Sequence, residues 1–210
     1  MIVKGKKVTI TRILGGISRA LRFWRYVWRK RQYAKYCITD NVKRPIHITP
    51  KYIELGERVS IWYHARIEGI RKYNNTIYTP RIIIHDGVSV QQNLHLTCAC
   101  QIEIGDNTAI AANVTITDIH HPYTDVTIPI EKQDLEVASV KIGRDCKIYN
   151  NVVILPGTVI GNHVTVGANS VVKGTYLDNC VVAGIPAVIV KRYDSAMGEW
   201  RKTDKRGIFI

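Results

Sequence analysis

The stretch from Ile142 to Leu177 repeats every six residues, and this period limits what the chain can fold into. Read in blocks of six, it is IGRDCK, IYNNVV, ILPGTV, IGNHVT, VGANSV and VKGTYL. A branched aliphatic residue opens each block, and glycine stands second at Gly143, Gly161 and Gly167. Such a period matches neither an α-helix nor an alternating strand. It is typical of a parallel β-helix built from hexapeptide repeats.

Each block is expected to form one short strand and one corner of a triangular prism. The first residue points into the prism, the fifth fills the next inward site, and glycine eases the corner backbone. An ordinary β-sandwich would instead show turn signals at intervals of about 8–12 residues without a fixed phase. The fifth-place residues are Cys146, Val152, Thr158, Val164, Ser170 and Tyr176.

The same phase extends back to Leu55 and predicts about five turns. It is interrupted by an insertion around Tyr73–Ile83, by a two-residue slip, and by a long excursion from Pro122 to Lys141. Every interruption follows a third block, so all three should leave from one corner. Five turns stacked at about 4.8 Å give a prism about 24 Å tall. The predicted block starts are residues 55, 61, 67, 84, 90, 96, 104, 110 and 116, and every sixth residue from 142 to 172.

Residues 10–37 combine apolar residues at helical spacing with many arginines and lysines. A basic, Trp-containing amphipathic helix is typical of a membrane-surface element, and its charges would favour the anionic inner face of the cell membrane. The alternative is a helix that packs on the prism end or on a neighbouring subunit. We therefore expect an N-terminal helical segment (1–40), a β-helix (41–192) with an excursion (122–141), and a C-terminal tail or short helix (193–210).

The composition points to an anionic partner in a reducing compartment. The net charge is +13, with 30 Lys and Arg against 17 Asp and Glu, which favours a phosphate-bearing cofactor or a membrane surface. Nucleic acid is the least expected partner, because the basic residues concentrate in one Trp-rich segment without a recognition motif. Five cysteines form no CxxC pair, and Cys100 and Cys146 fall on inward positions, so we expect a cytoplasmic protein. The sequence has no membrane-span pattern and no signal-peptide core.

Candidate chemistry concentrates in TDIHHPYTD, where the long excursion leaves the third turn. His121 could act as a general base, because histidine ordinarily titrates near neutral pH. Asp118, three residues earlier, could hold its tautomer by accepting a hydrogen bond from the ring. The plainer interpretation is that His120 and His121 are polar loop residues.

A zinc site is the alternative use of these histidines. His85, His95 and the pair His120 and His121 fall in successive turns, and zinc needs three or four ligands in a cluster. His85 is second in its block, His95 sixth and His120 fifth, so these side chains need not point the same way. We therefore assign no metal ligand.

The repeats, the His121-Pro122 dipeptide and the ending AGIPAVIVK resemble the hexapeptide-repeat acyltransferases over about residues 55–192. Within them the chain is most similar to maltose and galactoside O-acetyltransferases and to the related polysaccharide and lipopolysaccharide enzymes. The spacing of Asp118, His121 and Tyr123 resembles the polysaccharide branch. The resemblance implies a left-handed β-helix and a homotrimer that uses acetyl-CoA as acyl donor, with each active site between two prisms.

The resemblance also implies roles for individual residues. His121 would take a proton from a sugar hydroxyl while that oxygen attacks the thioester. Gln91 and Tyr123 would contact the substrate. Two departures are Lys173-Gly174, where the family usually has Thr-Lys, and Lys147-Ile148-Tyr149, where it usually has an aromatic-Ile-Gly run. The implied cofactor contacts are Asn150, Ala168, Lys173, Gly174 and Lys191.

We therefore predict an O-acetyltransferase that acts on a sugar hydroxyl of a cell-surface polysaccharide or lipopolysaccharide precursor. The basic helix stands where the maltose type carries a cap domain, which favours a lipid-linked or polymer-bound acceptor over a small free sugar. Two alternatives stay open: a metal-dependent enzyme of the carbonic anhydrase type on the same fold, and a non-catalytic trimeric scaffold that binds anionic surfaces.

Overall fold

A computed structural model describes Leu21, Trp24 and residues 42–210. The chain separates into two compact units, residues 1–35 and 36–210, and the second contains all of the repeats. Apart from Leu21 and Trp24, the predicted basic helix over residues 10–37 lies outside the described residues. No helix in the described part of the chain is both long enough and apolar enough to span a bilayer.

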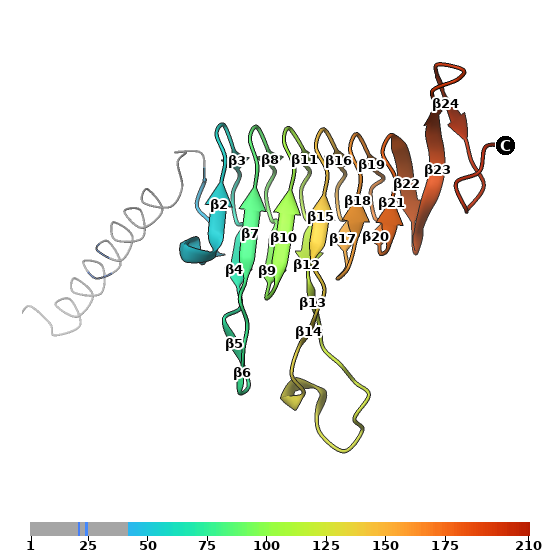
Figure 1. The fold of residues 1–210 in the computed structure, drawn as a ribbon. Coiled ribbons are helices and arrows are strands. Elements are labelled where there is room, and N and C mark those ends of the chain that lie inside the picture. The colour runs from blue at the N-terminus through green and yellow to red at the C-terminus, as the bar shows by residue number, and fades with distance from the viewer. Residues whose placement is uncertain (1–20, 22–23, 25–41) are drawn as a thin grey trace, which may run out of the picture. The chain divides into compact units, whose positions relative to one another are not determined.

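Three parallel sheets form the faces of the prism (Figure 1). Sheet A begins with β3 (Ser60–Ile61), β8 (Ser89–Val90), β11 (Ala109–Ile110), β16 (Lys147–Ile148), β19 (Thr165–Val166) and β22 (Cys180–Gly184), and ends with β23 (Ala187–Asp194) and β24 (Glu199–Lys202). Sheet B contains β1 (His47–Ile48), β4 (Arg66–Gly69), β9 (His95–Cys98), β12 (Thr115–Thr117), β17 (Val153–Ile154) and β20 (Val171–Val172). Sheet C contains β2 (Ile53–Leu55), β7 (Arg81–Ile84), β10 (Gln101–Ile104), β15 (Val140–Ile142), β18 (Val159–Ile160) and β21 (Thr175–Tyr176).

The chain visits sheets C, A and B in that order in every turn, which confirms the predicted five-turn prism. Its core is a column of aliphatic side chains, because each strand buries the residue that opens its block. The fifth-place residues of the regular stretch, from Cys146 to Tyr176, are also buried as predicted. All predicted first-place residues are buried: Leu55, Ile61, Ile67, Ile84, Val90, Leu96, Ile104, Ile110, Ile116, Ile142, Ile148, Ile154, Ile160, Val166 and Val172.

Left-handed backbone conformations build the corner between sheets A and B. This A–B corner has His64, Asn93, Asn113, Asn151 and Asn169 in successive turns, all with φ between 58° and 62°. Asparagine tolerates this region better than most residues. The asparagine side chains also form a ladder, in which each amide donates to the next over 2.9, 3.1 and 2.9 Å. A similar stack at the C–A corner contains Arg58, Gly87, Asn107, Asp145, His163 and Asn179.

The insertions leave from the third corner, between sheets B and C, as the phase predicts (Figure 1). The first contains the hairpin of β5 (Lys72–Tyr73) and β6 (Thr76–Ile77), and the excursion contains β13 (Ile119–His120), a 3-10 turn (Ile130–Lys132) and β14 (Glu136–Val137). Tyr78 joins them, because its hydroxyl donates to the carbonyl of Leu135 and accepts from the Leu135 N–H. A further 3-10 turn (Pro50–Tyr52) precedes β2.

Two expectations for the fold are wrong. Cys100 is only half-buried, whereas Cys98 is buried, because β9 continues its alternation to Cys98 before the chain turns. The C-terminal segment, expected as a tail or short helix, forms an antiparallel hairpin of β23 and β24 instead. The hairpin pairs with β22 and so covers the exposed edge of sheet A.

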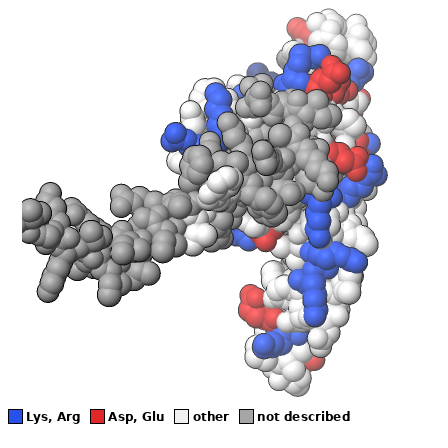
Figure 2. Space-filling view, turned by 90° about the vertical axis from the view of Figure 1, so that its left-hand side faces the viewer, with Lys and Arg blue, Asp and Glu red and all other residues white. Residues whose placement is uncertain are grey.

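Charged side chains cover the outside of the prism. Figure 2 shows basic side chains both on the prism and on the protruding insertions, with acidic side chains between them. On the outer face of sheet C, Glu103 contacts His85 at 3.1 Å and Lys141 at 3.9 Å. The outer face of sheet B is different, because there polar side chains line a groove.

Candidate active site

A groove of about 410 Å³ lies on the outer face of sheet B, beside the corner from which the insertions leave. Strands β4, β9 and β12 supply its floor, because their outward residues pair in register, Arg66 with His95 and His95 with Thr115. The insertions supply the walls. The floor residues are Arg66, His95, Thr97, Thr115 and Thr117, and the wall residues are Ile70, Tyr73, Ile119, His121 and Leu135.

His121 lies in the wall of this groove, directly after β13. Its ring meets the ring of Tyr73 edge to face, with centroids 5.4 Å apart and planes at 76°. The Tyr73 hydroxyl donates to Oε2 of Glu131 over 2.6 Å, and this bond raises the pKa of Tyr73 to about 12. Tyr73 therefore stays a neutral phenol, and it ties the first insertion to the excursion on either side of His121.

Asp118 does not orient His121, contrary to the prediction. Its carboxylate is fully buried and accepts the N–H groups of Ala99 and Cys100, each over 2.8 Å. It also accepts the thiol of Cys98 at 3.2 Å, and burial together with this carboxylate raises the pKa of Cys98. Asp118 therefore holds the corner between β9 and β10. Within the described residues, no hydrogen bond or ion pair reaches the His121 ring.

His95 faces the groove floor beside Arg66. Partial burial lowers the pKa of His95, and the nearby guanidinium of Arg66 lowers it further. At neutral pH the ring is therefore uncharged and can both donate and accept one hydrogen bond. Arg66 is paired with Glu68 on the same strand, where its Nε donates over 2.8 Å, and Glu68 also lies 3.6 Å from His47.

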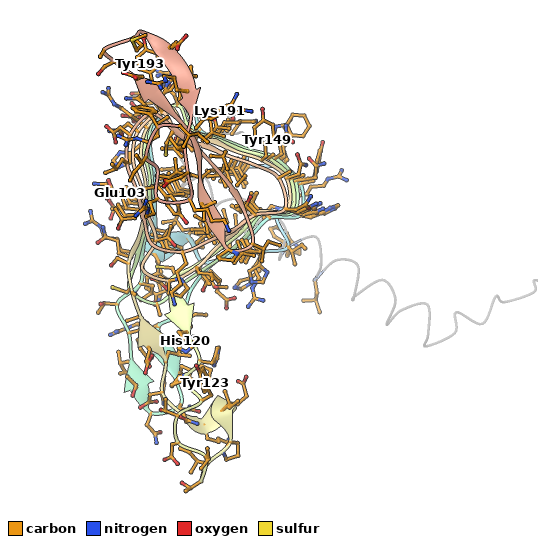
Figure 3. All side chains as sticks on the ribbon, turned by 90° about the vertical axis from the view of Figure 1, so that its right-hand side faces the viewer. Glu103, His120, Tyr123, Tyr149, Lys191 and Tyr193 are labelled. Carbon is orange, nitrogen blue, oxygen red and sulfur yellow. The ribbon has the colours of Figure 1, made fainter. Side chains whose placement is uncertain are left out.

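The two predicted substrate residues do not meet His121 in one chain. Tyr123 is 65% exposed, and its ring packs against His120 at 5.9 Å. Both lie on the excursion outside the prism (Figure 3). Gln91 is exposed at the A–B corner, where its N–H donates to the carbonyl of Ile110. Sheet B therefore separates Gln91 from His121.

The predicted cofactor residues fall on separate parts of the prism. Asn150 and Ala168 are exposed at the A–B corner, and Lys191 is exposed on β23, well away from the excursion (Figure 3). Lys173 and Gly174 are exposed at the B–C corner, from which the excursion that contains His121 also leaves. Gly174 has φ +105° and open space where a side chain would start, so a ligand could approach its backbone closely.

The histidines considered for zinc point from different surfaces. His85 contacts Glu103 on sheet C, His95 faces the groove on sheet B, and His120 packs against Tyr123. In the part of the chain that the structure describes, no three His, Cys, Asp or Glu side chains come together as a metal site would require.

Sequence reasoning missed most of the groove floor. The signal was present in the phase: Arg66, His95 and Thr115 each stand sixth in their block, and the residues that open the following blocks point inward. Residues on either side of an inward position face outward on the same sheet. Thr97 and Thr117, second in their blocks, follow by the same rule, and their hydroxyls are hydrogen-bonded at 3.0 Å.

Two family models match the chain. The model described as bacterial transferase hexapeptide (six repeats) matches residues 139–174, and the hexapeptide repeat of succinyl-transferase matches residues 96–118. Both matches fall on strands of the prism. The first covers most of the regular stretch, and the second runs from the last strand of the second turn through the third turn.

Among curated proteins, the chain is similar to the putative lipopolysaccharide biosynthesis O-acetyl transferase WbbJ of Escherichia coli. The two are 41% identical over 128 residues, which is 58% of this chain and 65% of that protein. The probable acetyltransferase Rv3034c of Mycobacterium tuberculosis is 31% identical over 70% of this chain and 47% of its own length. The chain thus spans less than two thirds of the length of either relative.

Among solved structures, the chain is similar to the hexapeptide-repeat acetyltransferase VCA0836 of Vibrio cholerae, complexed with acetyl coenzyme A. The TM-score is 0.56 at 23% identity, over 67% of this chain and 70% of that one. AntD, an N-acyltransferase of Bacillus cereus, also gives a TM-score of 0.56, at 19% identity over 76% and 81% of the two chains. At these identities the likeness establishes the fold, which is the predicted left-handed parallel β-helix.

Proposed function

We propose that this chain, which belongs to the hexapeptide-repeat acyltransferase family, moves an acetyl group from acetyl-CoA to a sugar hydroxyl. The observation that carries the proposal is the groove that joins His121 to a floor of hydrogen-bonding side chains, which are uncharged except for Arg66. The likeness to a protein named as a lipopolysaccharide biosynthesis O-acetyl transferase supports a cell-surface polysaccharide or lipopolysaccharide precursor as the acceptor.

In this proposal His121 is the general base. Its unprotonated ring nitrogen takes the proton of the acceptor hydroxyl while the hydroxyl oxygen attacks the thioester carbonyl carbon. The C–S bond of the resulting tetrahedral species then breaks, and the sulfur of CoA leaves with the proton that the imidazolium returns. No covalent enzyme intermediate is needed. The ring of Tyr73 restricts the movement of His121 during both proton transfers.

The groove floor suits an acceptor with several hydroxyl groups. Thr97, Thr115 and Thr117 supply hydroxyls that both donate and accept, and uncharged His95 does the same with its ring nitrogens. The groove walls add the apolar side chains of Ile70, Ile119 and Leu135. Small-molecule sites commonly combine apolar walls with a few placed polar groups in this way.

The scattered cofactor residues support the proposal of a homotrimer. One chain presents Asn150 and Ala168 at its A–B corner, but Lys173 and Gly174 at its B–C corner. An extended CoA arm that touches both sets would need the A–B corner of one prism to face the B–C corner of the next. Lys191 would then pair with a CoA phosphate. Light scattering of the purified protein should give three times the chain mass of 23.8 kDa.

We also propose contact between residues 10–37 and the inner face of the cell membrane, on the sequence pattern alone. Replacing Arg22, Arg25 and Arg29 by Gln should weaken binding to vesicles that contain phosphatidylserine, because each basic residue near an anionic surface contributes about 1 kcal/mol. Turnover of a water-soluble acceptor should not change. Equal vesicle binding by the variant and the wild type would contradict the membrane role.

The acetyl transfer itself is tested by incubating the protein with acetyl-CoA and a panel of acceptors, with release of free thiol as the readout. The panel contains bacterial O-antigen oligosaccharides and the methyl glycosides of their component sugars. We expect acceptor-dependent thiol release, and mass spectrometry should show an added acetyl group on the sugar. Thiol release that no acceptor stimulates would contradict the proposed function.

A further inference from the structure

Exposed aromatic side chains gather at the A–B corner of the first turn. Trp62 is 44% exposed and Tyr63 is 41% exposed, and their rings lie edge to face with centroids 6.5 Å apart. The ring of His64 lies 6.3 Å from that of Tyr63. We call Trp62, Tyr63 and His64 the corner aromatic cluster. Amphipathic aromatic rings left open to solvent in one place are typical of a binding surface.

Backbone hydrogen bonds hold the corner aromatic cluster in place. The N–H of Trp62 donates to the carbonyl of Val90, and the N–H of Asn93 donates to the carbonyl of Tyr63, each over 2.9 Å. Lys43 adds a cation–π contact, with its Nζ 4.6 Å from the centroid of the Trp62 ring. The backbone that carries these rings is therefore already held by the prism before a ligand binds.

The cluster directly precedes the groove floor along the chain. Tyr63 stands three residues before Arg66 on the groove floor, and β4 then leads to Ile70 in the groove wall near His121. An extended chain rises about 3.3 Å per residue, so Tyr63 lies up to about 10 Å beyond Arg66 and up to about 23 Å from Ile70. Strand β4 alone, from Arg66 to Gly69, spans about 10 Å, so an acceptor that reaches both His121 and the cluster is longer than a single sugar ring.

The next turn places two exposed amides beside the cluster. Gln91 and Gln92 stand at the same corner as Trp62 and Tyr63, one turn along the prism. Aromatic rings stack on the apolar C–H faces of sugars, and amide side chains bond sugar hydroxyls as both donors and acceptors. Gln91, for which the sequence predicts a contact with the substrate, lies at this corner and not beside His121.

We propose that the corner aromatic cluster is a second sugar subsite, so that the acceptor is an extended oligosaccharide rather than a single sugar. One end of the acceptor presents its hydroxyl to His121, and the chain crosses the outer face of sheet B toward Trp62 and Tyr63. This inference rests on the proposed acetyl transfer, and it names the acceptor class that the groove selects.

The test compares KM values for oligosaccharide and monosaccharide acceptors. The probes are O-antigen oligosaccharides of two to six sugar units and the methyl glycosides of their component sugars, with acetyl-CoA as donor. The variant replaces Trp62 and Tyr63 by Ala. The matched control replaces Trp200 and Tyr193 by Ala, because this pair is also 41% exposed and edge to face, at 5.8 Å, but lies on the C-terminal hairpin. Trp62→Leu keeps an apolar side chain without the ring.

We expect the double variant to raise the oligosaccharide KM about tenfold, which corresponds to the loss of one stacked sugar. The monosaccharide KM, the KM for acetyl-CoA and the oligomeric mass should not change. Trp62→Leu should show part of the same rise, and the control pair none. An unchanged oligosaccharide KM in both variants, or a double variant of altered oligomeric mass, overturns the inference. If wild-type protein acetylates neither probe, the proposed function itself fails.

Discussion

Two corners of the prism repeat one local structure, whereas the third is interrupted after each of the first three turns. The A–B corner stacks left-handed residues and an asparagine ladder through the turns. The B–C corner releases a hairpin, a short link and the long excursion. Within residues 42–210, the insertions that wall the groove on sheet B leave from the B–C corner.

The regular corners supply stability, and the irregular corner supplies the groove walls and His121. A residue held by the same contacts in each turn can be exchanged only at a cost in stability. His121, in contrast, is exposed, and its described contact is with a single ring, that of Tyr73. Asp118 lies between these two kinds of structure. It follows β12 directly, yet its carboxylate holds the corner between β9 and β10 in the preceding turn.

Replacing Asp118 by Ala should have the largest effect on stability. The N–H groups of Ala99 and Cys100 would lose their acceptor inside the protein, at a cost of about 2–5 kcal/mol. Urea unfolding monitored by circular dichroism measures the loss. Asp118→Asn keeps one amide oxygen as acceptor and should lose about half as much. A stable Asp118→Ala variant with an altered pH–rate profile would instead restore Asp118 as the partner of His121.

Replacing Asn151 by Ala tests the regular corner and should cost less. Asn151 has φ 60°, accepts a hydrogen bond from Asn113 and donates one to Asn169. The left-handed conformation alone costs a residue with a Cβ about 1–2 kcal/mol. Asn151→Gly also removes the ladder, but glycine adopts a positive φ without this cost. Its loss of unfolding free energy should therefore be smaller than that of Asn151→Ala by about this amount. Equal unfolding free energies for the Ala and Gly variants would show that the conformation contributes nothing.

Much of the fold was predictable because inward positions obey a strict period. Every first-place residue from Leu55 to Val172 is buried, and the insertions share one corner. The role of Asp118 was not predictable, because a spacing of three residues does not say that the carboxylate turns inward where β12 ends. The groove floor, including His95, depends on outward residues of three strands that lie side by side only in the folded sheet.

The C-terminal hairpin shows the other limit of sequence reasoning. The run AVIVKRYD of β23 is rich in β-branched residues, but no six-residue period continues through it. Its strand conformation follows from the unpaired edge that β22 leaves at the end of sheet A. A local sequence pattern does not show that the segment can pair with an unpaired strand edge elsewhere in the fold.

Tyr73→Phe separates two roles of this side chain at the irregular corner: the hydroxyl joins the two insertions, and the ring contacts His121. The variant loses the hydrogen bond to Glu131 but keeps the ring beside His121. We expect a small loss in unfolding free energy, because water competes for this exposed hydrogen bond, and only a few-fold fall in kcat. Tyr73→Ala removes the ring as well and should lower kcat further. A kcat that the two variants reduce equally would show that the hydroxyl, not the ring, positions His121.

The smallest expected effect is a dependence of stability on pH that comes from His95. The folded state lowers the pKa of His95 through burial and Arg66, whereas the unfolded chain titrates near the usual value of about 6.5. The contribution of neutral His95 to the free energy of unfolding should therefore be fully present above that value. It should decrease as the pH falls toward the lower pKa of the folded state. Urea midpoints at several pH values measure this, with His95→Asn as comparison. A variant with the same acid dependence as wild type would contradict the assignment.

The division between corners is tested most directly by measuring kcat/KM and unfolding free energy on the same three variants. His121→Ala should lower kcat/KM by about 10²–10⁴-fold and leave the unfolding free energy unchanged. Asn151→Ala should do the opposite, and His120→Ala, the exposed neighbour, should change neither. Full acetyl transfer by His121→Ala, or a loss of kcat/KM in Asn151→Ala as large as in His121→Ala under conditions where it is folded, would contradict the account.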